Sequence, residues 1–116
     1  FTLQQFPLLD INVGLQHIGD EVILNDLLHL LLTAAIPEDL LLIEDAYKQQ
    51  NWQKIEDLAH KMKSGALYCG ATRMQYACQY LERYRKAGHT KYLNELYEQL
   101  IQTLNQTMSY LKLRLG

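Results

Sequence analysis

The feature that most constrains the fold is a long run of regularly spaced apolar residues near the C-terminal end of the chain. Large apolar side chains recur there in steps of three and four residues, at Leu93, Tyr97, Leu100, Leu104, Met108, Leu111 and Leu115. This spacing places them on one face of an α-helix. The sequence therefore predicts a long amphipathic helix, capped at Thr90, whose apolar face needs other helices to pack against.

A second helical pattern begins after Gly19, with Asp20 as the expected cap. Its apolar positions are Leu24, Leu27, Leu28 and Leu31, and the pattern resumes after Pro37 at Leu40, Leu41, Ile43 and Tyr47. A proline inside a helical pattern either kinks one helix or separates two. Since no loop-forming residues surround Pro37, we expect a single helix that is kinked there.

Two more helices are expected between these, over Asn51–Leu67 with Asn51 as its cap, and from Thr72, as cap, to Ala87. The intervening turns are predicted at Tyr68-Cys69-Gly70 and at Gly88-His89. Four helices joined by short turns pack as antiparallel neighbours. The predicted fold is therefore an all-α, up-down-up-down four-helix bundle over residues 19–116. It is preceded over residues 1–18 by a lead-in with one short helix at Leu9–His17.

Charge and hydropathy exclude several classes of function. The formal net charge is −2, with 11 basic and 13 acidic residues, which lacks the basic excess of a nucleic-acid-binding protein. The longest uncharged run, Leu27–Pro37, is too short to span a bilayer. No secretory signal or initiator methionine is present, so we expect a domain excised from a larger protein that could be membrane-bound. The domain itself is expected to be cytoplasmic, without direct membrane contact, and monomeric because its core is self-sufficient. Cys69 and Cys78 are expected to be reduced thiols, and no metal site is expected.

One histidine does not belong to the expected core. At about 100° per residue, Ile55, Leu58, Ala59, Met62 and Ala66 form the buried stripe of their helix. His60 lies about 140° from Ile55, on the exposed face, with Lys63 and Ser64 one turn away. An exposed imidazole is largely neutral and nucleophilic at pH 7. Spacing alone does not separate such a residue from an ordinary surface histidine, which is the commoner case.

The residues around His60 resemble a known signature. In the run Ala59–Ala71, His60, Lys63 and Gly70 match the pattern H-x-x-K-G-x-x-x-x-x-G of histidine-containing phosphotransfer domains. Ser64 departs from the usual glycine, although it is still a small residue. The resemblance covers about residues 9–110, and it is closest to the phosphotransfer domains at the C-terminal end of hybrid sensor histidine kinases.

The resemblance implies a relay of phosphoryl groups, with a carrier in place of an enzyme. His60 would accept a phosphoryl group from an aspartate of a receiver domain and pass it to another receiver, while Lys63 would counter the phosphoryl charge. The chain would need no cofactor, because Mg²⁺ is expected on the receiver, and it has no nucleotide-binding motif for ATP. Docking of the receiver is expected around His60, with Ser64, Leu67, Glu56 and Gly70 as the candidate residues.

Several alternatives remain open at this point. The chain would also fit the phosphorylation domain of a chemotaxis-type kinase, a receiver-docking module that carries no phosphate, or a purely structural bundle. Tyr76, Tyr80 and Tyr84 lie one helical turn apart, and helix packing explains such a stripe better than partner binding does. The other histidines, His17, His29 and His89, are expected to be structural or surface residues.

Overall fold

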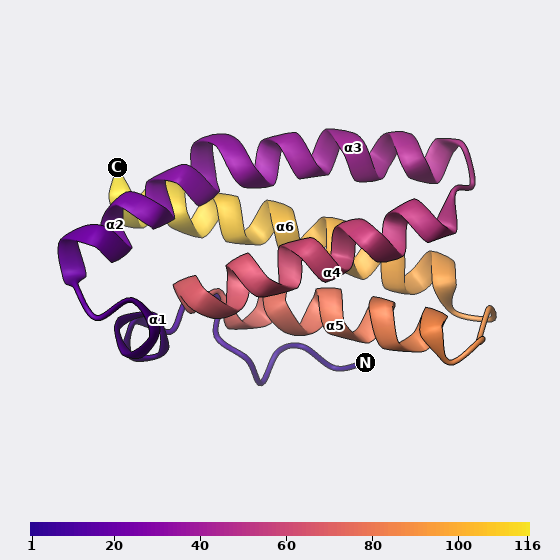
Figure 1. The fold of residues 1–116 in the computed structure, drawn as a ribbon, viewed down its shortest axis with the longest axis horizontal. Coiled ribbons are helices and arrows are strands. Elements are labelled where there is room, and N and C mark those ends of the chain that lie inside the picture. The colour runs from indigo at the N-terminus through magenta and orange to yellow at the C-terminus, as the bar shows by residue number, and fades with distance from the viewer.

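The structure is a computed structural model that describes residues 1–116, and it consists of helices joined by short connections (Figure 1). In chain order these are α1 (Ile11–Ile18), α2 (Glu21–Leu30), a π-helical turn η1 (Leu31–Ala35), α3 (Ile36–Lys48), α4 (Trp52–Cys69), α5 (Thr72–Lys86) and α6 (Leu93–Leu115). No residue is in a β-strand. The prediction of an all-helical bundle is confirmed. Helix α4 packs between α3 and α5, and α5 also packs on α6. None of the helices is both long enough and apolar enough to cross a lipid bilayer.

The helix around Pro37 is continuous, as the sequence predicted, and the irregularity in it is a π-helical turn. The backbone N–H of Ile36 donates to the carbonyl of Leu31, five residues earlier. Pro37 has no N–H to donate, and in a regular helix its ring would crowd the carbonyl of Thr33. The wider π turn directly before Pro37 accommodates the proline without ending the helix. Leu41, expected in the apolar pattern, is instead 72% exposed.

The expected caps are partly confirmed. The side chains of Asp20 and Asn51 accept hydrogen bonds from the backbone N–H groups of Ile23 and Lys54, as N-caps do. The predicted caps at Thr72 and Thr90 are wrong, because α5 and α6 begin at Thr72 and Leu93 without a side-chain cap. Each threonine lies next to a turn that already fixes the entry of the chain into its helix. The Thr72 hydroxyl donates to the carbonyl of Gly70, and the Leu93 N–H donates to the Thr90 carbonyl.

The predicted turn at residues 68–70 is shorter than expected. Helix α4 continues through Tyr68 and Cys69, and only Gly70 leaves it, with a φ of 81° in the left-handed region. The Gly70 N–H then closes the helix on the carbonyls of Ala66 and Leu67. A glycine is the residue that ends a helix in this way at least cost.

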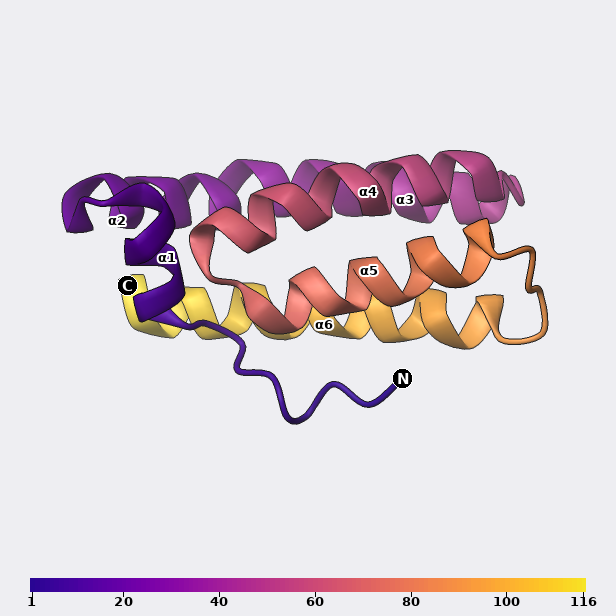
Figure 2. The ribbon, with the colours of Figure 1, turned by 60° about the horizontal axis from the view of Figure 1, so that its bottom comes forward.

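The N-terminal segment before α1 contributes one residue, Leu3, to the core of the bundle. Residues 1–10 run along α5 and α6 (Figure 2), and the Leu3 side chain is only 4% exposed. The ring of Phe6 stacks on Tyr76 with 4.0 Å between the centroids, and Phe1 packs against Tyr80 and Tyr84. The tyrosine stripe is therefore covered by this N-terminal segment, in place of the helix packing that we expected.

Candidate functional site

The side chain of His60 projects from the exposed face of α4, as the helical wheel predicted. Its side chain is 61% exposed, and the predicted stripe of Ile55, Leu58, Ala59, Met62 and Ala66 is buried on the opposite face. The middle of α4 therefore offers an accessible imidazole on a helix that is anchored through its other face.

A buried carboxylate on the neighbouring helix holds this imidazole. Glu82 of α5, whose side chain is 3% exposed, accepts a hydrogen bond from Nδ1 of His60 on its Oε2 atom. Its Oε1 atom accepts from Nζ of Lys63 at 2.6 Å, and Oε2 also accepts from Nζ of Lys86 at 2.9 Å. One carboxylate thus joins His60 and two lysines from two helices into a single cluster, which we call the Glu82 cluster.

The Glu82 cluster fixes the ionisation of its carboxylate. Burial by itself raises the pKa of Glu82, but hydrogen bonds from Lys63, Lys86 and His60 outweigh it and lower the pKa from 4.5 to about 2. Glu82 is therefore an anion at neutral pH and only accepts hydrogen bonds. Nδ1 of His60 must consequently carry the proton, and the lone pair of a neutral imidazole lies on Nε2, which points away from Glu82.

Comparison with known families agrees with this geometry. A model of the Hpt domain family matches residues 26–110, which is most of the chain and includes the whole Glu82 cluster. The chain belongs to the Hpt domain family. No curated protein and no solved structure shows significant similarity to it. Hpt domains carry phosphoryl groups on a histidine in phosphorelays and interact with the receiver domains of response regulators.

Three of the four other predicted site residues lie beside His60 on α4, and one does not. Ser64 is exposed one turn after His60, and Leu67 is half-buried on the following turn. Glu56, one turn before His60, is half-buried and its Oε1 atom lies 3.5 Å from Nη1 of Arg85. These three residues flank His60 along the exposed face of α4. Gly70 does not, because it is buried at the end of the helix.

The role of Gly70 is structural. A side chain at this position would overlap the carbonyl oxygen of Asp10. The two residues lie so close because the backbone N–H of Asp10 donates a hydrogen bond to the Gly70 carbonyl at 2.7 Å. Together with the positive φ, this close approach explains why the motif has a glycine here. Gly70 thus joins the start of α1 to the end of α4 and supports the helix that carries His60.

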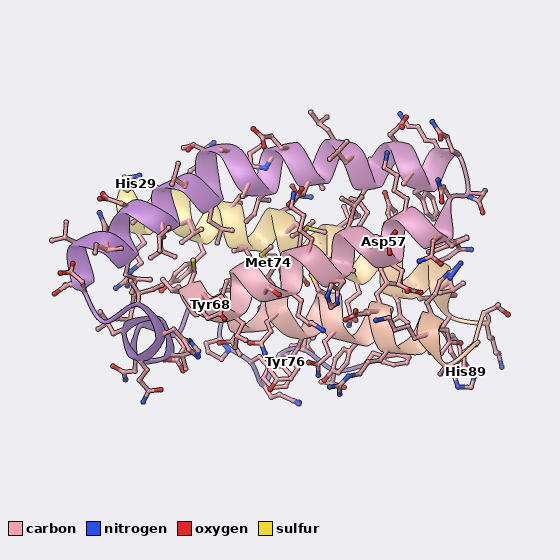
Figure 3. All side chains as sticks on the ribbon, viewed as in Figure 1. His29, Asp57, Tyr68, Met74, Tyr76 and His89 are labelled. Atoms are coloured by element: carbon pink, nitrogen blue, oxygen red, sulfur yellow. The ribbon has the colours of Figure 1, made fainter.

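The other three histidines and the two cysteines are not part of the Glu82 cluster. Figure 3 shows His29 on α2 and His89 beyond α5, at opposite ends of the Hpt domain, while Asp57 and Tyr68 lie on α4 to either side of its middle. His17 packs edge-on against Tyr68 with 5.5 Å between the ring centroids. Cys69 and Cys78 are free and buried, and burial raises the pKa of both thiols. No group of three or more His, Cys, Asp or Glu side chains is arranged to hold a metal ion.

Sequence reasoning missed Glu82 and Lys86. A helical wheel of α5 contained a signal for Glu82, because this residue follows Cys78 by one turn and belongs to the same buried face. A carboxylate on a buried face needs a charged partner. The sequence did not indicate which of the lysines would supply it, because that depends on how α4 and α5 pack. A second pair, Lys61 with the buried Asp39 of α3 at 2.9 Å, was also not foreseen.

Proposed function

We propose that His60 is the phosphorylated residue of this Hpt domain, which accepts a phosphoryl group from a receiver aspartate and passes it to a second receiver. The observation that carries the proposal is the contact between the exposed imidazole and the buried Glu82. In the neutral imidazole this contact places the lone pair on Nε2 of a side chain that is 61% exposed, and it holds the ring in one orientation, which a nucleophile in an in-line displacement requires.

The transfer balances without an external base. The lone pair of Nε2 attacks the phosphorus of the aspartyl phosphate, the N–P bond forms, and the P–O bond breaks. The receiver carboxylate leaves with the bonding electron pair. The proton on Nδ1 stays in place, so the imidazole ring becomes cationic, and the anionic Glu82 stabilises that charge. The reverse sequence of bonds delivers the phosphoryl group to the second receiver.

Lys63 is the proposed partner of the phosphoryl group on the Hpt side. Its side chain is 25% exposed and lies one helical turn after His60 on the same side of α4. An ammonium group one helical turn from the imidazole offsets negative charge as the phosphoryl group arrives. The Mg²⁺ ion of the reaction is expected on the receiver, in keeping with a carrier that needs no cofactor of its own.

The proposed docking surface is the exposed face of α4 around His60. Ser64 leaves space beside the imidazole, Leu67 provides partly exposed apolar surface, and Glu56 marks the edge toward the start of the helix. A small surface of this kind suits a transient complex. Gly70 contributes through the position of α1 and the end of α4.

The context of the domain is part of the same proposal. We place it in the cytoplasm, as part of a hybrid sensor kinase, with the up-down-up-down helix order that short turns favour and as a monomer when isolated. A chemotaxis-type kinase would instead present His60 to an ATP-binding domain. A receiver-docking module would bind the same partners without accepting phosphate.

Transfer from a phosphorylated receiver tests the function. The wild-type chain is expected to take up an acid-labile, base-stable label, and His60→Gln is expected to take up none. His29→Gln, which removes an exposed histidine on α2, is the matched control and should be labelled like the wild type. Label on His60→Gln would refute the choice of residue. Binding of receivers without any label would favour the docking module, and label only from a kinase domain with ATP would favour the chemotaxis type.

A further inference from the structure

Only two acidic side chains of the chain are buried, and each forms an ion pair with the part of α4 that carries His60. Glu82 of α5 holds His60 and Lys63 on one side of the helix. On the other side, Asp39 of α3, whose side chain is 7% exposed, accepts a hydrogen bond from Nζ of Lys61 at 2.9 Å. Helix α4 lies between α3 and α5 (Figure 1), so charged groups bind it to both neighbours.

The two buried carboxylates lie at the same level of the bundle. Lys61 directly follows His60, so the contact with Asp39 is made within one residue of the imidazole. The fully buried thiol of Cys78 is close to both carboxylates. Burial raises the pKa of this thiol, and the negative charges of Glu82 and Asp39 raise it further. The two contacts therefore hold the middle of α4 from both sides.

The core packing of α4 fixes the rotation of the helix only weakly at this level. From Ala59 to Ala66, the only buried residue with a long side chain is Met62. An alanine has no side chain beyond Cβ to interlock with a neighbouring helix, and the flexible side chain of methionine adapts to several arrangements. The ion pairs are consequently the contacts that can set the rotation of α4 at His60.

A small rotation of α4 would matter for an in-line reaction at His60. The ring nitrogens of an outward-pointing histidine lie about 6 Å from the helix axis, since a helix with its side chains is about 10–12 Å across. A rotation by about 10° would move Nε2 by roughly 1 Å, and a misplacement of that size can slow a reaction between positioned groups by about a hundredfold. A contact on one side alone leaves the helix free to roll about that contact.

We propose that Lys61 and Asp39 are positioning residues for phosphoryl transfer. Their ion pair, which we call the α3 clamp, acts together with the Glu82 cluster to fix the rotation of α4 and hence the direction of Nε2 of His60. The inference rests on the proposed function and deepens it. The α3 clamp acts through the helix, without contact to the phosphoryl group. Since the pair is neutral as a whole, removing both charges changes the position of the imidazole without changing the net charge around it.

The variant Asp39→Asn/Lys61→Met removes the clamp. It is expected to fold, because neutral groups of similar size often replace a buried ion pair without loss of stability, and Asp39→Asn alone is a milder variant. The first measurement needs no receiver and follows the exchange of the Nδ1 proton of His60 with water by nitrogen-15 NMR. This proton should exchange at least about threefold faster in the clamp variant, because its contact with Glu82 opens more often.

Two control variants accompany this measurement. Glu38→Gln/Lys54→Gln removes one acidic and one basic group from exposed positions of α3 and α4 that have no ion pair, and the Nδ1 proton should exchange as in the wild type. Lys61→Arg keeps a cation for Asp39 and should also behave as the wild type. His60→Gln identifies the resonances of His60.

The second measurement is the rate of transfer from a phosphorylated receiver. At saturating receiver, the clamp variant is expected to transfer about five- to twentyfold more slowly, because Nε2 is less often in line with the aspartyl phosphate. The receiver concentration that gives half the maximal rate should be unchanged, since the clamp does not serve docking. Labelling by phosphoramidate, a small chemical donor without a rigid partner surface, should proceed at the wild-type rate.

The outcomes separate the α3 clamp from the proposed function. Equal proton exchange and equal transfer rates in the clamp variant and the control would overturn the clamp, while label on wild-type His60 would still support the function. A higher half-saturating concentration without a slower maximal rate would also overturn the clamp, because Lys61 would then be a docking residue. Failure of every receiver to label the wild type, with faster proton exchange in the clamp variant alone, would refute only the proposed function. Failure of both measurements would overturn both.

Discussion

Replacing Glu82 by glutamine tests the physical basis of the site through the stability of the fold. Glutamine has the shape of a protonated glutamate but does not ionise, so Glu82→Gln isolates the contribution of the charge. The charged form is favoured in the folded state by His60, Lys63 and Lys86. The variant should therefore be less stable than the wild type wherever Glu82 is ionised.

The magnitude follows from the pKa. The folded-state pKa of Glu82 is about 2, against an ordinary value of 4.5, and each pH unit is worth about 1.4 kcal/mol. The ionised carboxylate then contributes about 3 kcal/mol at pH 7, an upper estimate because two of its three partners are largely exposed. A group with a depressed pKa stabilises the fold above its unfolded-state pKa and loses this effect as the pH falls through the folded-state pKa. The contribution should remain nearly whole above about pH 5, fall to less than half of its full value at pH 3, and nearly vanish at pH 2.

Urea denaturation of both proteins at pH 7, 5, 4 and 3 measures this contribution as a difference in free energy of unfolding. Glu44→Gln is the control, because Glu44 is an exposed residue of α3 without an ion pair, and its replacement should have little effect at any pH. A difference between wild type and Glu82→Gln that stayed constant from pH 7 to pH 3 would refute the reasoning, since loss of packing alone does not depend on pH.

Two further predictions concern the support of the site, and both are read by chemical denaturation. Gly70→Ala should lower the free energy of unfolding by about 1–3 kcal/mol, because it strains a residue at positive φ and crowds Asp10. Gly65→Ala, which has open space around it on the surface of α4, should raise the free energy of unfolding by roughly 0.5–1 kcal/mol. Equal effects of the two substitutions would contradict the role given to Gly70. Leu3→Ala should lower the free energy of unfolding by about 2–4 kcal/mol because Leu3 is buried, whereas Leu113→Ala should change it little because Leu113 is 87% exposed. An unchanged stability of Leu3→Ala would mean that the N-terminal segment does not stabilise the bundle.

Local patterns in the sequence were sufficient for much of the fold and for the exposure of His60. Asn51 caps its helix from within four residues, and the exposure of His60 follows from the periodicity of a single helix. Both depend only on neighbours along the chain, which a sequence displays directly. The same holds for the buried face of α6, where the predicted positions are buried or packed against the core.

What the sequence did not reveal depends on contacts between distant residues. Glu82 follows His60 by 22 residues, and their contact exists only because α4 and α5 pack face to face. Phe6 and Tyr76 are further apart still, so the covering of the tyrosine stripe was not foreseen. The caps at Thr72 and Thr90 failed for a different reason, because the backbone turns before α5 and α6 already position these helices.

The π-helical turn at Leu31–Ala35 affects how this chain aligns with its relatives. A π turn holds one residue more than an α-helical turn. Two regular turns, or seven residues, back from the buried Ile36 lead to the exposed His29, and one further turn leads to the exposed Asn25, whereas the buried residues are Leu28 and Leu24. A relative with an unbroken α-helix here would therefore match α2 in register only if a one-residue gap is placed within Leu31–Ala35.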